Sequence, residues 1–168
     1  EIMKQGISPI YEPGLDELLE RNYKEKRLDF TTDYANAYKN ADIVFIGVGT
    51  PERADGSANL DYVFGVCKQI AENVTKDCLV VVKSTVPIGT NDRVEVFLKE
   101  NLVNDVHIEV ASNPEFLAQG TAVVDTLHAS RIVIGVESRK AEEKLRYVYE
   151  RFNQPIVVTN RRSAEMIK

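Results

Sequence analysis

The sequence predicts an α/β fold built on a doubly wound, mostly parallel sheet. Strand-like runs of almost purely apolar residues alternate with stretches of helical periodicity along much of its 168 residues. Fully apolar strands indicate a sheet that is covered on both faces, as in doubly wound folds. Two loop sequences, STVPIGT at 84–90 and SNPEFLAQG at 112–120, each follow directly after such a run. Loops beyond the carboxyl ends of parallel strands form the ligand-binding crevice of such sheets, so these two loops are the candidate functional segments.

The N-terminal part of the chain predicts two helices and a short strand. Pro13-Gly14 is expected to open an amphipathic helix, because leucines recur after it at helical spacing. The segment 28–31, which is bounded by charged residues, is expected to form a short strand. Asp33 carries a side chain suited to cap a second helix, which is expected to reach Asn40.

The rest of the chain is a regular succession of strands and helices. Five strands are predicted, each a short apolar run near polar or turn residues, at 43–48, 79–82, 106–111, 131–136 and 156–158. Helices are predicted from Asn59 or Asp61 to about Val74, and at 91–101 and 138–152. Ser163 is expected to cap one more helix.

One signature of dinucleotide-binding sheets is absent. Such sheets normally carry GxGxxG between their first strand and first helix. The nearest match, at 47–49, leads into Pro51 rather than into a helix. We therefore expect a Rossmann-like sheet that lacks its first βαβ unit, in a chain that is a segment of a longer protein.

Charge and hydropathy argue against two classes of partner. The formal net charge is −5, the isoelectric point is near 5.2, and no basic cluster is longer than Arg161-Arg162. These values give no electrostatic reason to expect nucleic acid or an anionic membrane as a partner. No apolar run approaches the roughly 20 residues that a membrane-spanning helix needs. A cytoplasmic location is the expectation.

The cysteines and histidines predict no special chemistry. Cys67 and Cys78 have no CxxC partner and no flanking histidine to favour a thiolate, so we expect packed, unreactive thiols. His107 and His128 stand outside any spacing of ligand residues that would form a metal site. No metal is expected.

Six ordered segments make the chain resemble the NAD-dependent nucleotide-sugar dehydrogenases. They are PIYEPGLDELL at 9–19, ADIVFIGVGTP at 41–51, KSTVPIGT at 83–90, SNPEFLAQGTAV at 112–123, SRIVIG at 130–135 and AEMIK at 164–168. Each segment alone would be a weak signal of the family, but the order and spacing of the six match the family over the whole chain. The resemblance implies NAD as cofactor and a UDP-sugar as substrate. Within the family it is greatest to the enzymes that oxidise UDP-glucose at C6 to UDP-glucuronate, by two hydride transfers and hydrolysis of a thioester.

The resemblance also implies a division of the protein. Residues 1–160 are expected to be the central and C-terminal part of the NAD-binding domain, and 161–168 the start of the helix that leads to a second domain. The family's catalytic cysteine belongs to that second domain, so neither Cys67 nor Cys78 inherits its role. The isolated chain is expected to be inactive, and the whole protein to form a homo-oligomer through the absent region.

Three residues inherit catalytic roles from the resemblance. Glu115 is the candidate base that takes a proton from the hydrolytic water. Thr85 offers a hydroxyl that can hold this water or the sugar oxygen, and Lys168 offers an ammonium where negative charge builds on the C6 oxygen. Substrate contacts are expected from Glu115, Phe116, Leu117, Ala118, Gln119 and Lys168.

Cofactor contacts are implied at the ends of two predicted strands and on the SNPEF loop. The residues concerned are Val48, Gly49, Thr50, Pro51, Ser84, Thr85, Val86 and Gln119. Many relatives have glutamate where this chain has Gln119. Glutamine keeps an acceptor oxygen but loses the charge, so a hydrogen-bonding role survives there and a role as a base does not.

Two other functions stay compatible with the sequence. A sister enzyme that acts on GDP-mannose or another UDP-sugar would share these loops. A non-catalytic α/β remnant would keep the fold without the chemistry. Without the resemblance, Glu115 would most often be a solvated loop carboxylate, Thr85 a helix-entry or turn hydroxyl, and Lys168 a surface lysine.

Overall fold

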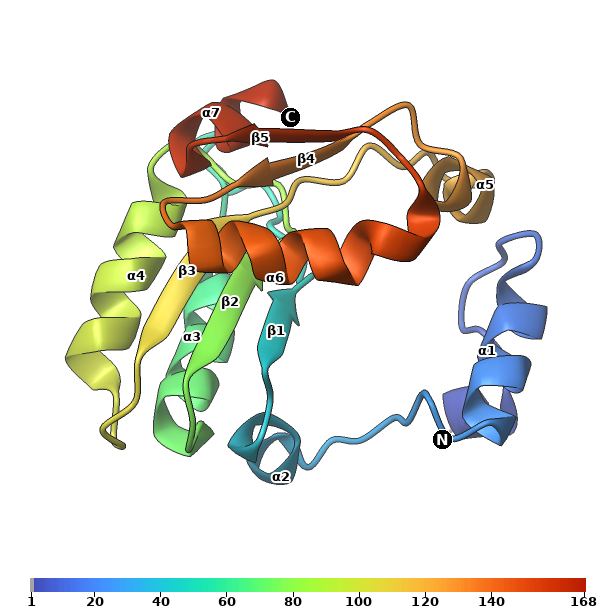
Figure 1. The fold of residues 1–168 in the computed structure, drawn as a ribbon, viewed down its shortest axis with the longest axis horizontal. Helices are drawn as coiled ribbons and strands as arrows, with labels where there is room; N and C mark the ends of the chain where they lie inside the picture. Colours follow the sequence, from blue (N-terminus) through green and yellow to red (C-terminus); the bar gives the residue numbers. More distant parts are fainter. Residues whose placement is uncertain (1) are drawn as a thin grey trace. The chain divides into compact units, whose positions relative to one another are not determined.

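The computed structural model describes residues 2–168, which divide into two compact units. The first unit comprises residues 2–32 and 116–130, and the second comprises residues 33–115 and 131–168. The second unit contains the sheet and most of the helices (Figure 1).

The sheet of the second unit has five strands in the described residues, in the order β1-β2-β3-β4-β5. Their bounds are β1 Ile43–Ile46, β2 Cys78–Val82, β3 Ile108–Ser112, β4 Ile132–Gly135 and β5 Ile156–Thr159. Neighbouring strands run parallel, except that β4 is antiparallel to β3 and meets it at one residue pair, Ser112 with Gly135. The mostly parallel sheet expected from the sequence is confirmed.

Helices cover both faces of this sheet. The helices α3 (Asp61–Asn73) and α4 (Thr90–Asn101) pack on one face, and α6 (Arg139–Tyr149) packs on the other (Figure 1). The short α2 (Tyr34–Lys39) precedes β1, a 3₁₀ turn, η2 (Glu150–Phe152), follows α6, and α7 (Arg161–Ile167) follows β5. The doubly wound arrangement is therefore confirmed.

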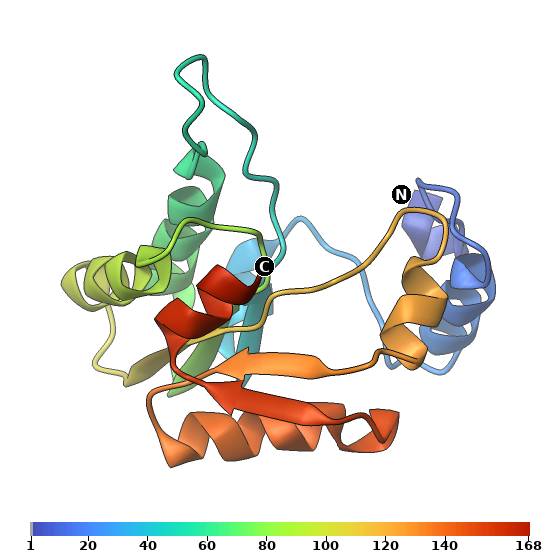
Figure 2. The same cartoon turned by 90° about the horizontal axis from the view of Figure 1, so that it is seen from above.

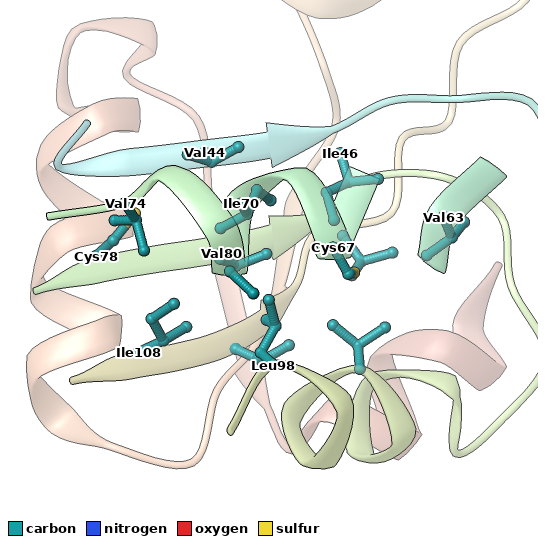
Figure 3. Packing of buried hydrophobic residues seen from close by; sticks show 14 of the residues in the cluster. Val44, Ile46, Val63, Cys67, Ile70, Val74, Cys78, Val80, Leu98 and Ile108 are labelled. Atoms are coloured by element: carbon teal, nitrogen blue, oxygen red, sulfur yellow. The ribbon is translucent and has the colours of Figure 1, made fainter. Parts of the chain in front are cut away.

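Strand β2 shows why its sequence is apolar at every position. Side chains alternate between the two faces of a strand. Val80 and Val82 belong to the core beneath α3 and α4, whereas Leu79 and Val81 belong to the core beneath α6. Figure 3 shows the first of these cores, where Val80 lies among side chains from α3, α4 and the neighbouring strands. With helices on both faces, no position on this strand is available to a polar residue.

One of the two predicted helix caps, Asp33, is confirmed. Asp33 accepts a hydrogen bond from the backbone N–H of Asn36 at 3.2 Å, at the start of α2. The amphipathic helix after Pro13-Gly14 is also present, with Gly14 preceding its first residue. The assignment of Ser163 as a cap is wrong, because Asn160 caps α7 and accepts from the N–H of Ser163 at 2.8 Å. An asparagine and a serine three residues apart offer the same cap chemistry, and the sequence does not decide between them.

The first unit contains η1 (Ile2–Gln5), α1 (Leu15–Lys24) and α5 (Ala122–Leu127). The strand expected at 28–31 is wrong, since that segment pairs with no strand in the described residues. Helix α5 was not predicted. The buried Glu12 carboxylate accepts from the N–H of Gly120 at 2.5 Å and of Ala122 at 3.3 Å, so the start of α5 is held by a side chain more than a hundred residues away.

Candidate active site at the carboxyl edge of the sheet

The loops that follow β1 and β2 are bonded to each other. The Ser84 hydroxyl donates to the carbonyl oxygen of Val48 at 2.5 Å. In return, the Thr50 hydroxyl donates to the carbonyl oxygen of Thr85 at 2.7 Å. These four residues all belong to the predicted cofactor set, and the structure brings them together at the edge that the sequence indicated.

The backbone beside these bonds is open. A Cβ built on Gly49 meets no heavy atom within 4 Å. Pro51 leads away into the turn before α3, where its carbonyl oxygen accepts from the N–H of Asn59 at 2.8 Å; Figure 2 shows this loop projecting ahead of α3. Val86 is buried in the core beneath α3 and α4. An open backbone at a strand end permits close approach of a dinucleotide, so the space at Gly49 fits NAD, and the cofactor roles of the predicted residues stay predictions.

Glu115 and Lys168 form an ion pair. The Lys168 Nζ lies 2.7 Å from the Glu115 Oε1 and 2.5 Å from the Glu115 carbonyl oxygen. The side chains are 22% exposed for Lys168 and 29% exposed for Glu115, so the pair is only partly shielded from bulk water and is open to a ligand. The carboxylate follows the end of β3 and the ammonium follows the end of α7. The structure thus joins two of the three predicted catalytic residues across 53 positions of sequence.

The third predicted catalytic residue, Thr85, is exposed and follows the end of β2. Its carbonyl oxygen holds the Thr50 hydroxyl. The catalytic role of its own hydroxyl stays a prediction.

The remaining predicted substrate residues belong to the first unit. Phe116 and Leu117 are about two-fifths exposed, and the N–H of Ala118 donates to Asp125 at 3.0 Å. Gln119 is also exposed. Their roles at the substrate, and that of Gln119 at the cofactor, stay predictions.

Asn113 anchors the loop that carries Glu115. It is 1% exposed, and its amide Nδ2 donates to the carbonyl oxygen of Val133 at 2.8 Å. Its Oδ1 accepts from the Lys83 Nζ at 3.3 Å and from the Tyr149 hydroxyl. Burial raises the pKa of Tyr149 to about 12, so this hydroxyl stays protonated and remains a donor. The loop is therefore fixed two residues before the carboxylate.

Lys83 is a second cation close to the ion pair. Burial lowers the pKa of its ammonium, while the charge of Glu115 raises this pKa and the charge of Lys168 lowers it further. Sequence reasoning gave Lys83 and Asn113 no role, although both lie inside the motifs that carry the resemblance. Tyr149 comes from α6 and had no motif to mark it.

Glu165 is another functional candidate that sequence reasoning missed. Its carboxylate accepts from the backbone N–H of Gly89 at 2.6 Å and of Asn91 at 2.7 Å. The Asn91 side-chain amide donates to it as well, at 2.6 Å. Its place in AEMIK was the only signal, and its partners lie more than 70 positions away.

Both cysteines are packed inside the protein. Cys67 and Cys78 are 0% and 3% exposed. Burial raises the pKa of Cys67 to about 12 and that of Cys78 to about 11. Among residues 2–168, no group of three or more histidine, cysteine or acidic side chains is arranged to hold a metal ion. In the same part of the chain, no helix combines the length and apolarity needed to cross a membrane.

We expect these two thiols to resist alkylation in the native protein at neutral pH. The thiolate is the reactive species, and raised pKa values together with burial leave almost none of it accessible. Brief treatment with iodoacetamide followed by peptide mass spectrometry should find Cys67 and Cys78 unmodified, whereas the same treatment in denaturant should modify both. Rapid native labelling of either one would contradict their assignment as packed thiols.

Comparison with known proteins gives a consistent result. Residues 1–153 match the model of the UDP-glucose/GDP-mannose dehydrogenase family, NAD binding domain. UDP-glucose 6-dehydrogenase YwqF of Bacillus subtilis (strain 168) is 50% identical over 166 residues, which cover 99% of this chain and 38% of the relative. The UDP-glucose 6-dehydrogenase of Rhizobium meliloti (strain 1021) is 47% identical over 173 residues, covering 99% of this chain and 39% of the relative. The chain spans about two-fifths of the length of these relatives.

Solved structures confirm the Rossmann-like fold. A UDP-glucose dehydrogenase from the archaeon Pyrobaculum islandicum superposes with a TM-score of 0.94 at 39% identity, over 99% of this chain and 39% of that one. A GDP-mannose dehydrogenase from Pseudomonas aeruginosa gives a TM-score of 0.93 at 36% identity, over 99% of this chain and 40% of that one. The family match identifies the bound cofactor of this domain as NAD. The chain belongs to the UDP-glucose/GDP-mannose dehydrogenase family, and its residues 1–153 correspond to that family's NAD-binding domain.

Proposed function

We propose that this chain is part of a longer NAD-dependent enzyme that oxidises UDP-glucose at C6 to UDP-glucuronate. The observation that carries the proposal is the Glu115–Lys168 ion pair, which lies in the same unit as the bonded loops after β1 and β2. The relatives named UDP-glucose 6-dehydrogenase, at 50% and 47% identity, support this substrate.

In this proposal the loops after β1 and β2 hold the cofactor. NAD, when bound, accepts the hydride that leaves C6 of the sugar. The backbone at 48–51 lines one side of it, where Gly49 leaves room for close approach. Residues 84–86 line the other side, and the hydroxyl bonds between the loops keep the two sides together.

The ion pair supplies the acid–base chemistry. The Lys168 ammonium stabilises negative charge on the C6 oxygen when the hydroxyl proton leaves. The Glu115 carboxylate takes a proton from the water that releases the acid at the end of the reaction. Thr85 holds this water or the sugar oxygen, and residues 116–119 contact the substrate, with Gln119 acting as a hydrogen-bonding residue only.

Assay of the full-length protein against three substrates tests the proposal. Oxidation of an alcohol to a carboxylate consumes two NAD and one water, so we expect two NADH for each UDP-glucose. GDP-mannose and UDP-N-acetylmannosamine should give much lower kcat/KM. A preference for GDP-mannose would overturn the substrate assignment but keep the family chemistry, and no NADH with any of the three would favour the non-catalytic remnant.

The isolated 168-residue chain is expected to form no NADH with UDP-glucose. The family's nucleophilic cysteine is assigned to the second domain, and Cys67 and Cys78 are buried. The full-length protein in the same buffer is the control. Turnover by the isolated chain would contradict the assignment of that cysteine.

We further propose that the full-length enzyme is a cytoplasmic homo-oligomer. Light scattering would test its oligomeric state, and fractionation of native cells would test its location.

A further inference from the structure

The C-terminal end of α7 and the residue that follows it contact both loops of the candidate site. Glu165 lies in the last turn of α7, and Lys168 directly follows the helix, three residues further along the chain. Glu165 binds the end of the STVPIGT loop, and Lys168 binds Glu115 on the SNPEF loop. In both ribbon views, α7 lies near the end of α4 at which the STVPIGT loop enters that helix (Figures 1 and 2).

The Glu165 side chain belongs to α7 and caps the N-terminus of another helix, α4. The first N–H groups of α4 have no acceptors within the helix. Its cap position is Gly89, which is in a left-handed conformation with φ of 86° and has no side chain to offer. The Glu165 carboxylate, only 7% exposed, accepts the N–H groups of Gly89 and Asn91, and its negative charge complements the positive end of the α4 dipole.

Helix α7 is itself fixed by other contacts. The Arg161 guanidinium lies 2.9 Å from Asp92 and 2.6 Å from Glu95, both on α4. On the sheet side, Gly135 of β4 permits close approach of Ala164. The position of the Glu165 carboxylate is therefore set by the docking of α7, and the loop end is placed relative to Lys168.

We propose that Glu165 is a positioning residue of this active site, which ties the cofactor-side loop to the end of α7 that leads into Lys168. Its carboxylate sets the spacing between residues 84–89 and the Glu115–Lys168 pair. The catalytic part of this inference rests on the proposed function. The part that concerns cofactor binding rests only on the family's NAD-binding domain.

The Glu165→Gln variant tests the proposal in the full-length protein. Glutamine keeps the size, but one carboxylate oxygen becomes an NH₂ group that faces an N–H donor, so at least one of the three contacts is lost. We expect faster hydrogen exchange at the Gly89 and Asn91 amides and NADH affinity weakened by at least about threefold. We also expect kcat to fall on the order of tenfold or more, as small misplacements of reacting groups cause.

Arg161→Met is the matched control. It also loosens α7 from α4, but it leaves the Gly89 and Asn91 contacts in place. We expect its thermal midpoint to fall at least as far as that of Glu165→Gln, while its losses of NADH affinity and kcat stay clearly smaller than those of Glu165→Gln. A milder variant, Asn91→Ser, removes one of the three contacts and should shift NADH affinity in the same direction by less.

Three results would overturn the proposal. The first is wild-type NADH affinity in Glu165→Gln, or in Asn91→Ser if the glutamine variant does not fold. The second is an equal loss of NADH affinity in Arg161→Met, which would show that Glu165 acts only through stability. The third is unchanged exchange at the Gly89 and Asn91 amides. Absence of turnover in the wild-type protein would instead overturn the proposed function, and the affinity and exchange measurements would still decide the role of Glu165.

Discussion

Replacing Glu115 with glutamine in the full-length protein is expected to lower kcat for UDP-glucose oxidation by about 10²- to 10⁴-fold, the usual contribution of a general base. Glutamine has the size of glutamate but cannot take up a proton. Lys168 keeps its bond to the carbonyl oxygen of residue 115, so the geometry of the loop should survive the change. Steady-state NADH formation measures the loss, and KM for UDP-glucose should change far less than kcat.

Glu109→Gln is the matched control for this experiment. Glu109 lies on the same strand as the start of the SNPEF loop, and its carboxylate accepts from the Ser138 hydroxyl rather than from Lys168. We expect kcat within about twofold of wild type for this variant, since a partly exposed hydrogen bond contributes only about 1 kcal/mol of stability and no chemistry. If Glu115→Gln retained wild-type kcat, or if both variants lost activity equally, Glu115 would not be the base.

Replacing Gly135 with alanine is expected to destabilise the protein by at least about 1–3 kcal/mol, the usual cost of overpacking. The added Cβ would lie 2.6 Å from the Ala164 Cβ and 2.9 Å from the Arg161 Cα. It would also lie 2.9 Å from the Asn160 carbonyl oxygen. Two of these neighbours are backbone atoms and the third is a Cβ, so only displacement of α7 relieves the clash. Because α7 leads to Lys168, both the thermal midpoint and kcat should fall.

Gly65→Ala is the matched control, for which the same change of glycine to alanine is expected to have the opposite effect on stability. Gly65 is an exposed residue inside α3, and a Cβ built there meets no heavy atom within 4 Å. Alanine in a helix interior is favoured over glycine by up to about 1 kcal/mol. The thermal midpoint of Gly65→Ala should stay the same or rise. A midpoint for Gly135→Ala as high as that of Gly65→Ala would show that α7 does not pack against β4 as closely as described.

The sheet was predictable from the sequence because its strands bury side chains in two hydrophobic cores, one on each face of the sheet. In β2 all five residues are buried. A short, continuously apolar run of this kind is typical of a strand that is covered on both faces. The segment 28–31 has strand-like composition, but a strand also needs a hydrogen-bonding neighbour, and none of the described strands pairs with it. Helix α5 escaped prediction because its start is held by Glu12, a contact that no local pattern contains.

The candidate site was predictable only in part. The family motifs pointed to Glu115 and Lys168, and the structure brings them into contact. The roles of Asn113 and Glu165 depend on which distant groups meet them in space, namely Val133 for the first and Gly89 for the second. A motif marks such residues as present but does not tell whether they touch a ligand or hold the loop that does.

The single residue pair between β3 and β4 has a consequence for how this sheet coheres. Across that junction the backbone ladder is minimal, whereas Ala141 and Leu145 of α6 pack against strands on both sides of it. Cohesion there depends on removal of apolar surface from water rather than on peptide hydrogen bonds. This hydrophobic driving force weakens on cooling. We therefore expect the contact between β3 and β4 to weaken toward low temperature sooner than that between β2 and β3, which are joined by backbone pairing along their whole length.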